Sequence, residues 1–164
     1  FTATKTGSYT LIAADDDRRS TGNYNLFLAK MPHTATGEAD GHGGPLSNGQ
    51  TKTASITLGD MDLYTFRASQ GSAISATMTM LSREWDFMGE LELYDPTGRL
   101  IMSRYSSSVA SFTLAAPMSG NYTLLAADVH RSSTGSYTVR VAGIAPPTTG
   151  TPEISIWYGT TELR

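Results

Sequence analysis

Hydrophobic and polar residues alternate in short runs along the central part of the chain. Alternation with a period of two is typical of β-strands that are buried on one face. We expect eight such strands, with turn-forming residues between them. They lie at residues 54–58, 62–67, 73–80, 90–94, 99–103 and 110–115, and in the two halves of 120–141. Short strands at regular spacing predict an all-β fold, an antiparallel β-sandwich.

A type I turn is predicted at residues 95–98, which read Asp-Pro-Thr-Gly. Asp at the first position, Pro at the second and Gly at the fourth are the preferences of this turn. Leu91 and Leu93 come before it and are expected to point into the core. The turn should therefore close a hairpin between Leu93 and Leu100.

The stretch 120–141 has a counterpart near the start of the chain. Residues 7–28 match it at a constant offset of 113 residues, and 12 of these 22 positions are identical. In 120–141 a Ser-Ser-Thr-Gly break separates two amphipathic runs, so we expect a hairpin. A repeat spaced by about one domain indicates tandem modules rather than a solenoid, whose units are shorter. The chain is therefore predicted to open inside one module and to contain a second, complete one.

The repeat and the composition divide the chain into five expected parts. They are 1–32, the closing strands of an upstream module; 33–44, a glycine-rich linker; 45–145, the complete sandwich; 146–152, a Pro/Thr linker; and 153–164, the first strand of a further domain or a donor strand.

The strands expected within residues 1–31 need a partner sheet, because an isolated hairpin is marginally stable in water. The missing strands belong either to a longer polypeptide or to another chain that completes the sheet by strand addition. Six residues are expected to make these strand-pairing or inter-module contacts. They are Tyr9, Leu11, Tyr24, Leu26, Ile154 and Ile156.

Several blocks of the sequence occur in the order of a known domain family. They are 59–71, 91–98, 120–124 and 134–139. Together they resemble the bacterial pre-peptidase C-terminal domain family over residues 44–143, and residues 1–31 match its closing third, as expected of tandem copies. The resemblance implies a jelly-roll-like β-sandwich that is exported, lacks catalysis of its own, and is repeated in, or appended to, surface proteins and secreted hydrolases. Some relatives bind collagen or polysaccharide, and some carry calcium.

One departure from the family pattern concerns calcium. The family often has acidic residues after the Asp-Pro-x-Gly hairpin, whereas residues 103–108 here read Ser-Arg-Tyr-Ser-Ser-Ser. Four other aspartates are candidate cation ligands, because hard cations prefer carboxylate oxygens. They are Asp15, Asp17, Asp60 and Asp62. The alternatives are a solvated turn for the first two and turn capping for the last two. No cofactor is required by the pattern, and calcium is the candidate cation.

Aromatic side chains are the other candidates for binding. Trp85 and Phe87 lie in a connection between strands, and Trp157 lies in the last part of the chain. An exposed aromatic ring can stack on a sugar or anchor a protein partner. The alternative for Trp85 and Phe87 is that they cap the end of the core.

Charge and motif content exclude several functions. The net charge is −3 and no basic run occurs, which argues against nucleic acid as a partner. Cysteine is absent, and no apolar stretch approaches the ~20 residues of a membrane span. His33 and His42 lie in the linker, where residues 41–44 are expected to be a flexible spacer, and His130 lies in a turn. No nucleophile, base and orienting carboxylate can be assigned from the pattern, so the chain is not expected to be an enzyme.

The sequence favours a non-catalytic structural or interaction module of a long exported tandem-repeat protein, extracellular or on the cell surface. Its expected partners are neighbouring modules of the same chain or identical chains. The alternative is an accessory module of a secreted bacterial hydrolase that binds polysaccharide or an extracellular protein. The domains encoded by the parent gene would separate the two. Further copies without a catalytic domain favour the structural module, and an adjacent protease or glycosidase favours the accessory module.

Overall fold

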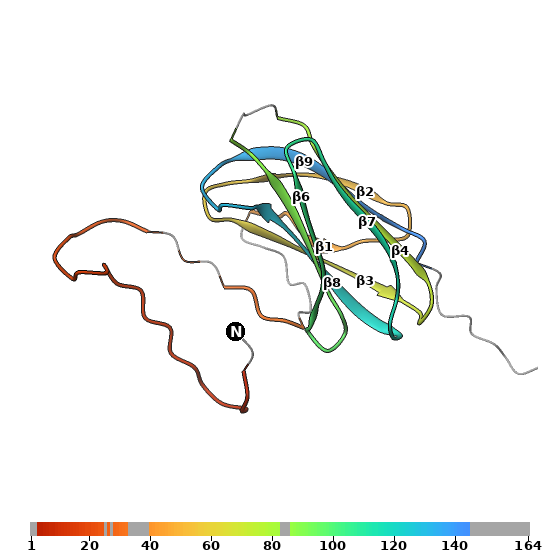
Figure 1. Cartoon of the computed structure of the whole chain (residues 1–164), viewed down its shortest axis with the longest axis horizontal. Coiled ribbons are helices and arrows are strands. Elements are labelled where there is room, and N and C mark those ends of the chain that lie inside the picture. The colour runs from red at the N-terminus through yellow and green to blue at the C-terminus, as the bar shows by residue number, and fades with distance from the viewer. Residues whose placement is uncertain (1–2, 25, 27, 33–39, 83–85, 145–164) are drawn as a thin grey trace, which may run out of the picture.

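Two β-sheets pack face to face, and the side chains between them form the core (Figure 1). The computed structural model describes residues 3–24, 26, 28–32, 40–82 and 86–144. The strands are β1 (Gly44–Pro45), β2 (Thr51–Ile56), β3 (Met61–Ala68), β4 (Ala73–Met80), β5 (Gly89–Tyr94), β6 (Leu100–Ser106), β7 (Val109–Ala115), β8 (Gly120–Asp128) and β9 (Gly135–Ala142).

One sheet has five strands in the order β1-β3-β8-β5-β6, and the other has four in the order β2-β9-β4-β7. Neighbouring strands are antiparallel, except for the short parallel pair of β1 with β3. The ranges described contain no helix, and so none that is long and apolar enough to cross a membrane. The expectation of an all-β sandwich is confirmed.

The core follows from the alternation seen in the sequence, because successive residues of a strand point to opposite faces. Ile74, Ala76 and Met78 are fully buried from β4, and Leu91 and Leu93 are fully buried from β5. The expected β5–β6 hairpin forms, with Tyr94 opposite Leu100 and a hydrogen bond from Gly98 N to Asp95 O at 2.8 Å. The largest fully buried side chains include three tyrosines. They are Tyr64, Tyr122 and Tyr137.

The hairpin expected over residues 120–141 is wrong. β8 lies between β3 and β5 in the five-stranded sheet, whereas β9 lies between β2 and β4 in the other sheet. The intervening residues 129–134 therefore cross from one sheet to the other. The two-residue period specifies which face a side chain takes but does not say with which strand it pairs, and this is why the alternation alone suggested a local hairpin.

Residues 3–24 extend away from the sandwich as an arm, drawn in red to orange in Figure 1. The described residues of this arm, with 26 and 28–32, are not assigned to any strand, although strands were expected there. Tyr9, Leu11, Tyr24 and Leu26 are each more than half exposed. The division of the chain into an upstream module and a linker stays a prediction.

The arm nevertheless keeps the local backbone of the β8–β9 region. Tyr9 Oη donates a hydrogen bond to Lys5 O at 2.6 Å, and Tyr122 Oη donates one to Met118 O at 2.6 Å. Tyr9 and Tyr122 are equivalent in the repeat, and each bond spans four residues. A tyrosine bonded to the backbone shortly before it is a recurring corner device of β-sandwiches.

The loop after each tyrosine is also repeated. Arg18 and Arg131, again equivalent in the repeat, are the positive-φ residues other than glycine, at 54° and 58°, within the part of the chain described. Arg18 N bonds Asp15 O at 3.1 Å, and Arg131 N bonds Asp128 O at 3.1 Å. The sequence repeat is therefore also a repeat of local conformation.

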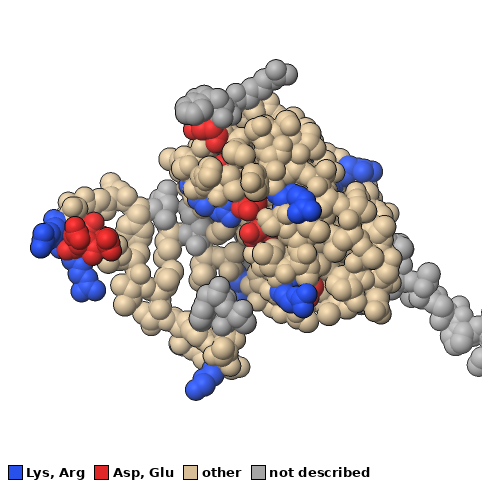
Figure 2. Space-filling model, in the orientation of Figure 1, with Lys and Arg blue, Asp and Glu red and all other residues tan. Residues whose placement is uncertain are grey.

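The arm carries charge of both signs. Figure 2 shows acidic and basic side chains side by side at its outer end, where residues 15–19 read Asp-Asp-Asp-Arg-Arg. Elsewhere on the face shown, the charges are scattered, and neither sign forms a broad patch. The face shown therefore carries no basic stripe of the kind that marks a nucleic-acid-binding surface.

Candidate functional site

Asp62 is a carboxylate in the interior of the sandwich. It lies near the start of β3 and shares the inward face with Tyr64 and Phe66, because residues two apart on a strand point the same way. Its exposed fraction is 0%. Tyr137 Oη donates a hydrogen bond to Asp62 Oδ2 at 2.5 Å, and the hydroxyls of Tyr137 and Tyr64 lie 2.8 Å apart. The three side chains thus form a buried polar chain that joins the two sheets.

The second carboxylate oxygen of Asp62 is an exception to this pairing. Asp62 Oδ1 is buried and has no hydrogen-bond partner among the described residues. Buried polar atoms in folded proteins nearly always have a partner, because leaving one unpaired costs about 1–3 kcal/mol. The unpaired oxygen therefore marks a position where a proton, a water or a cation would be stabilising.

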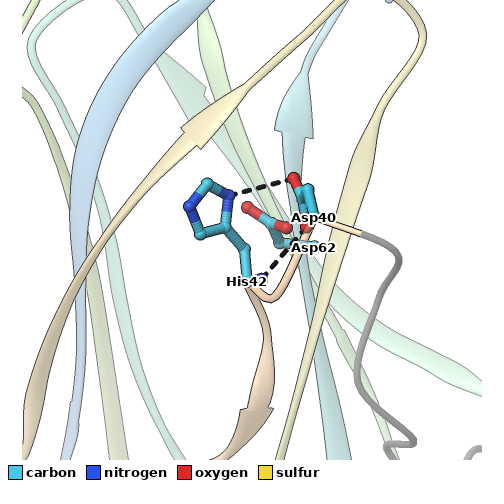
Figure 3. A group of neighbouring side chains, drawn as sticks. All are labelled: Asp40, His42 and Asp62. Atoms are coloured by element: carbon cyan, nitrogen blue, oxygen red, sulfur yellow. Dashed lines mark hydrogen bonds and ion pairs between the residues drawn. The ribbon is translucent and has the colours of Figure 1, made fainter.

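Asp40 and His42 lie beside this carboxylate, as Figure 3 shows. His42 N donates to Asp40 Oδ1 at 3.0 Å, which closes a short turn of the kind that aspartate favours. The His42 ring is held by its Nδ1, which lies 3.1 Å from Ser55 O and 3.0 Å from Asp40 Oδ2. A neutral ring with its proton on Nδ1 can donate to either oxygen.

The expectation of a flexible spacer at residues 41–44 is not met. Besides the His42 contacts with Asp40 and Ser55, Lys52 Nζ donates to Gly43 O at 2.8 Å, and Gly44 begins the strand that pairs with β3. The β1–β3 pairing brings residues 40–42 to the end of β3 where Asp62 lies. Residues 40–44 are therefore held against the sandwich by specific contacts.

Asp40, His42 and Asp62 together form what we call the Asp-His-Asp cluster. One potential ligand atom from each lies within 4.8 Å of the other two, which is the spacing of atoms that share one ion. Two carboxylates and an imidazole suit a divalent transition metal such as Zn²⁺. Calcium takes six to eight oxygens, so three side chains of which one is imidazole fit it less well.

Burial raises the pKa of Asp62 to about 7, because the charged form loses its hydration between the sheets. The hydrogen bond from Tyr137 opposes this rise, and the negative charges of Asp60 and Asp40 add to it. A cation in the Asp-His-Asp cluster would favour the ionised carboxylate and lower its pKa. Proton and cation would therefore compete for Asp62 near neutral pH.

The other three aspartates predicted as cation ligands are placed elsewhere. Asp60 caps a turn, since its Oδ1 accepts from Met61 N at 2.8 Å and its Oδ2 from Thr57 N at 3.3 Å. Asp15 is exposed in the arm, and its Oδ2 accepts from Arg19 N at 2.9 Å. Asp17 is exposed in the same loop. The turn-capping alternative holds for Asp60, and the structure brings none of the three into the Asp-His-Asp cluster.

The aromatic candidates have different outcomes. Phe87 is 1% exposed within the main core, where its ring lies against Gly135, so its assignment as a ligand-binding residue is wrong. A ring enclosed by the two sheets cannot stack on a sugar. Trp85, Trp157, Ile154 and Ile156 lie outside the described residues.

Sequence reasoning missed two members of the cluster. Asp40 and His42 stand in a glycine-rich stretch that reads Asp-Gly-His-Gly-Gly, and such composition is usual in linkers. The available signal was an aspartate and a histidine two positions apart, both of them metal-binding residue types, and two further aspartates, Asp60 and Asp62, around the start of β3. Only the parallel pairing of β1 with β3 shows that the two stretches meet.

No family model and no curated protein matches this sequence. Among solved structures, the chain is similar to the pre-peptidase C-terminal domain of collagenase from Bacillus anthracis. The TM-score is 0.52 at 16% identity, over 66% of this chain and 99% of that chain. This likeness shows a shared sandwich fold.

Two further solved structures are similar at lower scores. One is PliG from Aeromonas hydrophila, a periplasmic inhibitor of g-type lysozyme, with a TM-score of 0.48 and 16% identity over 61% of this chain and 96% of that chain. The other is the Yersinia pseudotuberculosis-derived mitogen, with a TM-score of 0.44 and 13% identity over 63% of this chain and 92% of that chain.

Proposed function

We propose that this chain is a non-catalytic structural segment of a long exported protein built from tandem β-sandwich modules. Residues 45–145 form one module, and the arm supplies the closing strands of the preceding one. The proposal is supported above all by the repeated local geometry of the arm. The corner at Tyr9 and the loop at Arg18 reproduce those at Tyr122 and Arg131.

The positions of β8 and β9 in the two sheets indicate which neighbouring strands the arm would need. Each is a central strand with a neighbour on both sides, and the two belong to different sheets. Tyr122, Leu124 and Tyr137 are fully buried, whereas their counterparts Tyr9, Leu11 and Tyr24 are exposed. Strands equivalent to β8 and β9 would bury those side chains only inside a second sandwich. Its remaining strands come from the parent polypeptide or from an identical chain.

The Asp-His-Asp cluster has a structural role in this proposal. Residues 40–42 are the point where the chain enters the module, and Asp62 belongs to its core. A divalent cation held by all three would fix the entering segment to the sandwich and pair the orphaned Asp62 oxygen. We assign it no reaction step.

The test extends the chain toward its N-terminus by one repeat length of 113 residues of the parent protein. Backbone amide hydrogen exchange is then compared for residues 9–15 in the extended and the present chain. We expect slow exchange in the extended chain and fast exchange in the present one, because central strands exchange only through large openings. Equal, fast exchange in both, at low and at high protein concentration, would overturn the proposal.

A second candidate is an accessory module of a secreted hydrolase that binds polysaccharide or an extracellular protein. It is favoured by the fold shared with a domain of a collagenase. With Phe87 buried, Trp85 and Trp157 are the aromatic residues left to test. Retention on insoluble collagen and polysaccharide is compared for the unmodified chain, Trp85→Ala and Trp157→Ala. Tyr105→Ala, at a residue that is 61% exposed on β6, is the control. No retention of the unmodified chain would remove this candidate.

A further inference from the structure

The outer face of the five-stranded sheet carries a small apolar patch. Its centre is formed by Leu63 of β3 with Leu125 and Ala127 of β8, all buried although they point away from the main core. Met61 and Tyr94 lie at its margin. Ala29 and Met31, which follow the arm, pack against this patch and cover it. We call these five sheet residues the outer patch and residues 29–32 the strap.

The strap also makes a close backbone contact with the turn at residues 95–98. Gly98 has φ of 85°, and a Cβ placed on it would lie 2.8 Å from the carbonyl carbon of Met31 and from the nitrogen of Pro32. The turn itself is held by Asp95, whose Oδ1 accepts from Thr97 N at 2.8 Å and from Arg99 N at 3.1 Å. A glycine is thus needed both for the turn and for the approach of the strap.

The equivalent residues after β9 follow a different course. Lys30 and Met31 of the strap correspond to Gly143 and Ile144 in the repeat. Gly143 has φ of 77°, and a Cβ placed on it would lie 1.9 Å from Ala73 O, so a side chain at that position would clash with the backbone of β4. Ile144 turns back into the core of its own module, where it is 5% exposed. Met31 instead packs on the module that follows it in the chain.

We propose that the strap and the outer patch form a fixed joint between consecutive modules. The partner of the patch is the preceding module of the same chain, held through residues 29–32, which begin at the equivalent of Ala142, the last residue of β9. This inference rests on the proposed function. The chain is anchored again at residues 40–42 by the His42 contacts with Asp40 and Ser55, so only residues 33–39 separate the two anchored segments. Consecutive modules then keep one orientation instead of swinging as beads on a flexible linker.

Spin labels test the joint, and the absence of cysteine makes specific labelling simple. Lys30 is exposed between the two residues that face the patch, and Ser111 is exposed on β7. The pair Lys30→Cys and Ser111→Cys should give one narrow distance distribution by pulsed electron paramagnetic resonance. Met31→Asp should replace it with a broad one, because a carboxylate cannot stay on the apolar patch.

Leu28→Asp is the matched control. Leu28 is 83% exposed, and the substitution introduces the same charge three residues away from Met31. It should leave the narrow distribution unchanged, and thermal melting should show that the sandwich remains folded in both variants. A broad distance distribution in the labelled chain that keeps Met31 would overturn the joint. An unchanged narrow distribution in the Met31→Asp variant would also overturn it.

The chain extended by one repeat separates failure of the joint from failure of the proposed function. A second label at Asp17→Cys reports on the upstream module, because the equivalent His130 is exposed on this module. Protected arm amides with a narrow distance from residue 17 to residue 111 support the joint. Protected amides with a broad distance overturn the joint alone. Unprotected amides overturn the proposed function and with it the joint, even if the strap stays on the patch.

Discussion

The hydroxyl of Tyr137 on β9 donates a hydrogen bond to Asp62 on β3, across the interior that separates the two sheets. Tyr137→Phe removes this donor and leaves a second oxygen of Asp62 unpaired. We expect the free energy of unfolding to fall by about 1–3 kcal/mol, the usual cost of an unsatisfied buried polar atom. Urea unfolding measures the change.

Tyr105→Phe is the control for the loss of a hydroxyl, because Tyr105 is exposed on β6 and its ring does not enter the core. It should change the free energy of unfolding by no more than about 0.5 kcal/mol. An equal loss in the two variants would contradict a specific role for the buried bond.

The raised pKa of Asp62 predicts a particular pH dependence of stability. In the unfolded chain an aspartate titrates near pH 4, whereas in the folded protein the pKa of Asp62 is raised to about 7. Between these values the folded state binds one more proton than the unfolded state. Stability should therefore fall as the pH rises from about 4 to 7, by at most about 1.4 kcal/mol per pH unit from this group.

Asp62→Asn isolates this contribution, because the amide keeps the shape but does not titrate. Free energies of unfolding measured by urea at several pH values should lose this downward slope in the variant. Asp60→Asn is the comparison, since Asp60 lies two residues away and caps a turn by accepting from Met61 N. A slope that survives in Asp62→Asn would refute the assignment to Asp62.

A divalent cation in the Asp-His-Asp cluster should stabilise the folded state, since a ligand that binds only the native protein raises its melting temperature. After removal of metals with a chelator, we expect Zn²⁺ to raise the melting temperature of the unmodified chain more than Ca²⁺ does. The rise should be larger at pH 8 than at pH 6, because the pKa of Asp62 lies between them.

His42→Ala and Asp40→Asn should abolish this rise in melting temperature. His130→Ala is the matched control, because His130 is exposed in the connection between the sheets and lies outside the cluster. The cation assignment fails if Zn²⁺ stabilises His42→Ala as much as the unmodified chain.

Phe87→Ala tests the corrected role of this residue as part of the core. Phe87 is buried in the main core, and its ring lies so close to Gly135 that a Cβ there would come within 2.3 Å of it. Removal of the ring should cost about 3–5 kcal/mol of folding free energy, as for other buried aromatic residues. Thermal or urea unfolding measures it, and a loss below 1 kcal/mol would restore the idea of a surface residue.

The sequence predicted most strands of the sandwich well because their alternation is a local property. The bounds expected for residues 73–80 agree with β4, and the aspartate, proline and glycine of residues 95–98 correctly predicted a turn. Partner choice is not local in this way. Whether β8 pairs with β9 or with β3 depends on residues some 60 positions away, and the period of two is the same in either case.

The candidate site was predicted only in part for the same reason. Asp62 could be singled out because it stands beside Asp60 at the start of a strand. His42 could not, because a histidine between glycines has the composition of a linker and its neighbours come from the β1–β3 pairing. The apolar residues on both faces of β8 were a further signal: Leu125 and Ala127 indicate that something covers the outer face of that sheet.

Asp15 and Asp128 provide the last prediction, because they hold equivalent loops in different surroundings. Asp128 is fully buried and its Oδ2 accepts from Ser132 N at 3.0 Å and Ser133 N at 3.2 Å. Asp15 is exposed and its Oδ2 accepts from Arg19 N at 2.9 Å and Ser20 N at 3.1 Å. Asp128→Ala should cost this chain about 1–3 kcal/mol of folding free energy.

Asp15→Ala should leave the stability of the present chain unchanged, since its loop lies outside the folded sandwich. In the chain extended by one repeat the same substitution should destabilise the upstream module, because the loop would then connect two central strands as residues 129–134 do. Separate unfolding transitions, followed by hydrogen exchange in each repeat, measure the two effects. If Asp15→Ala has no effect in the extended chain, the two loops are alike in local conformation but not in function.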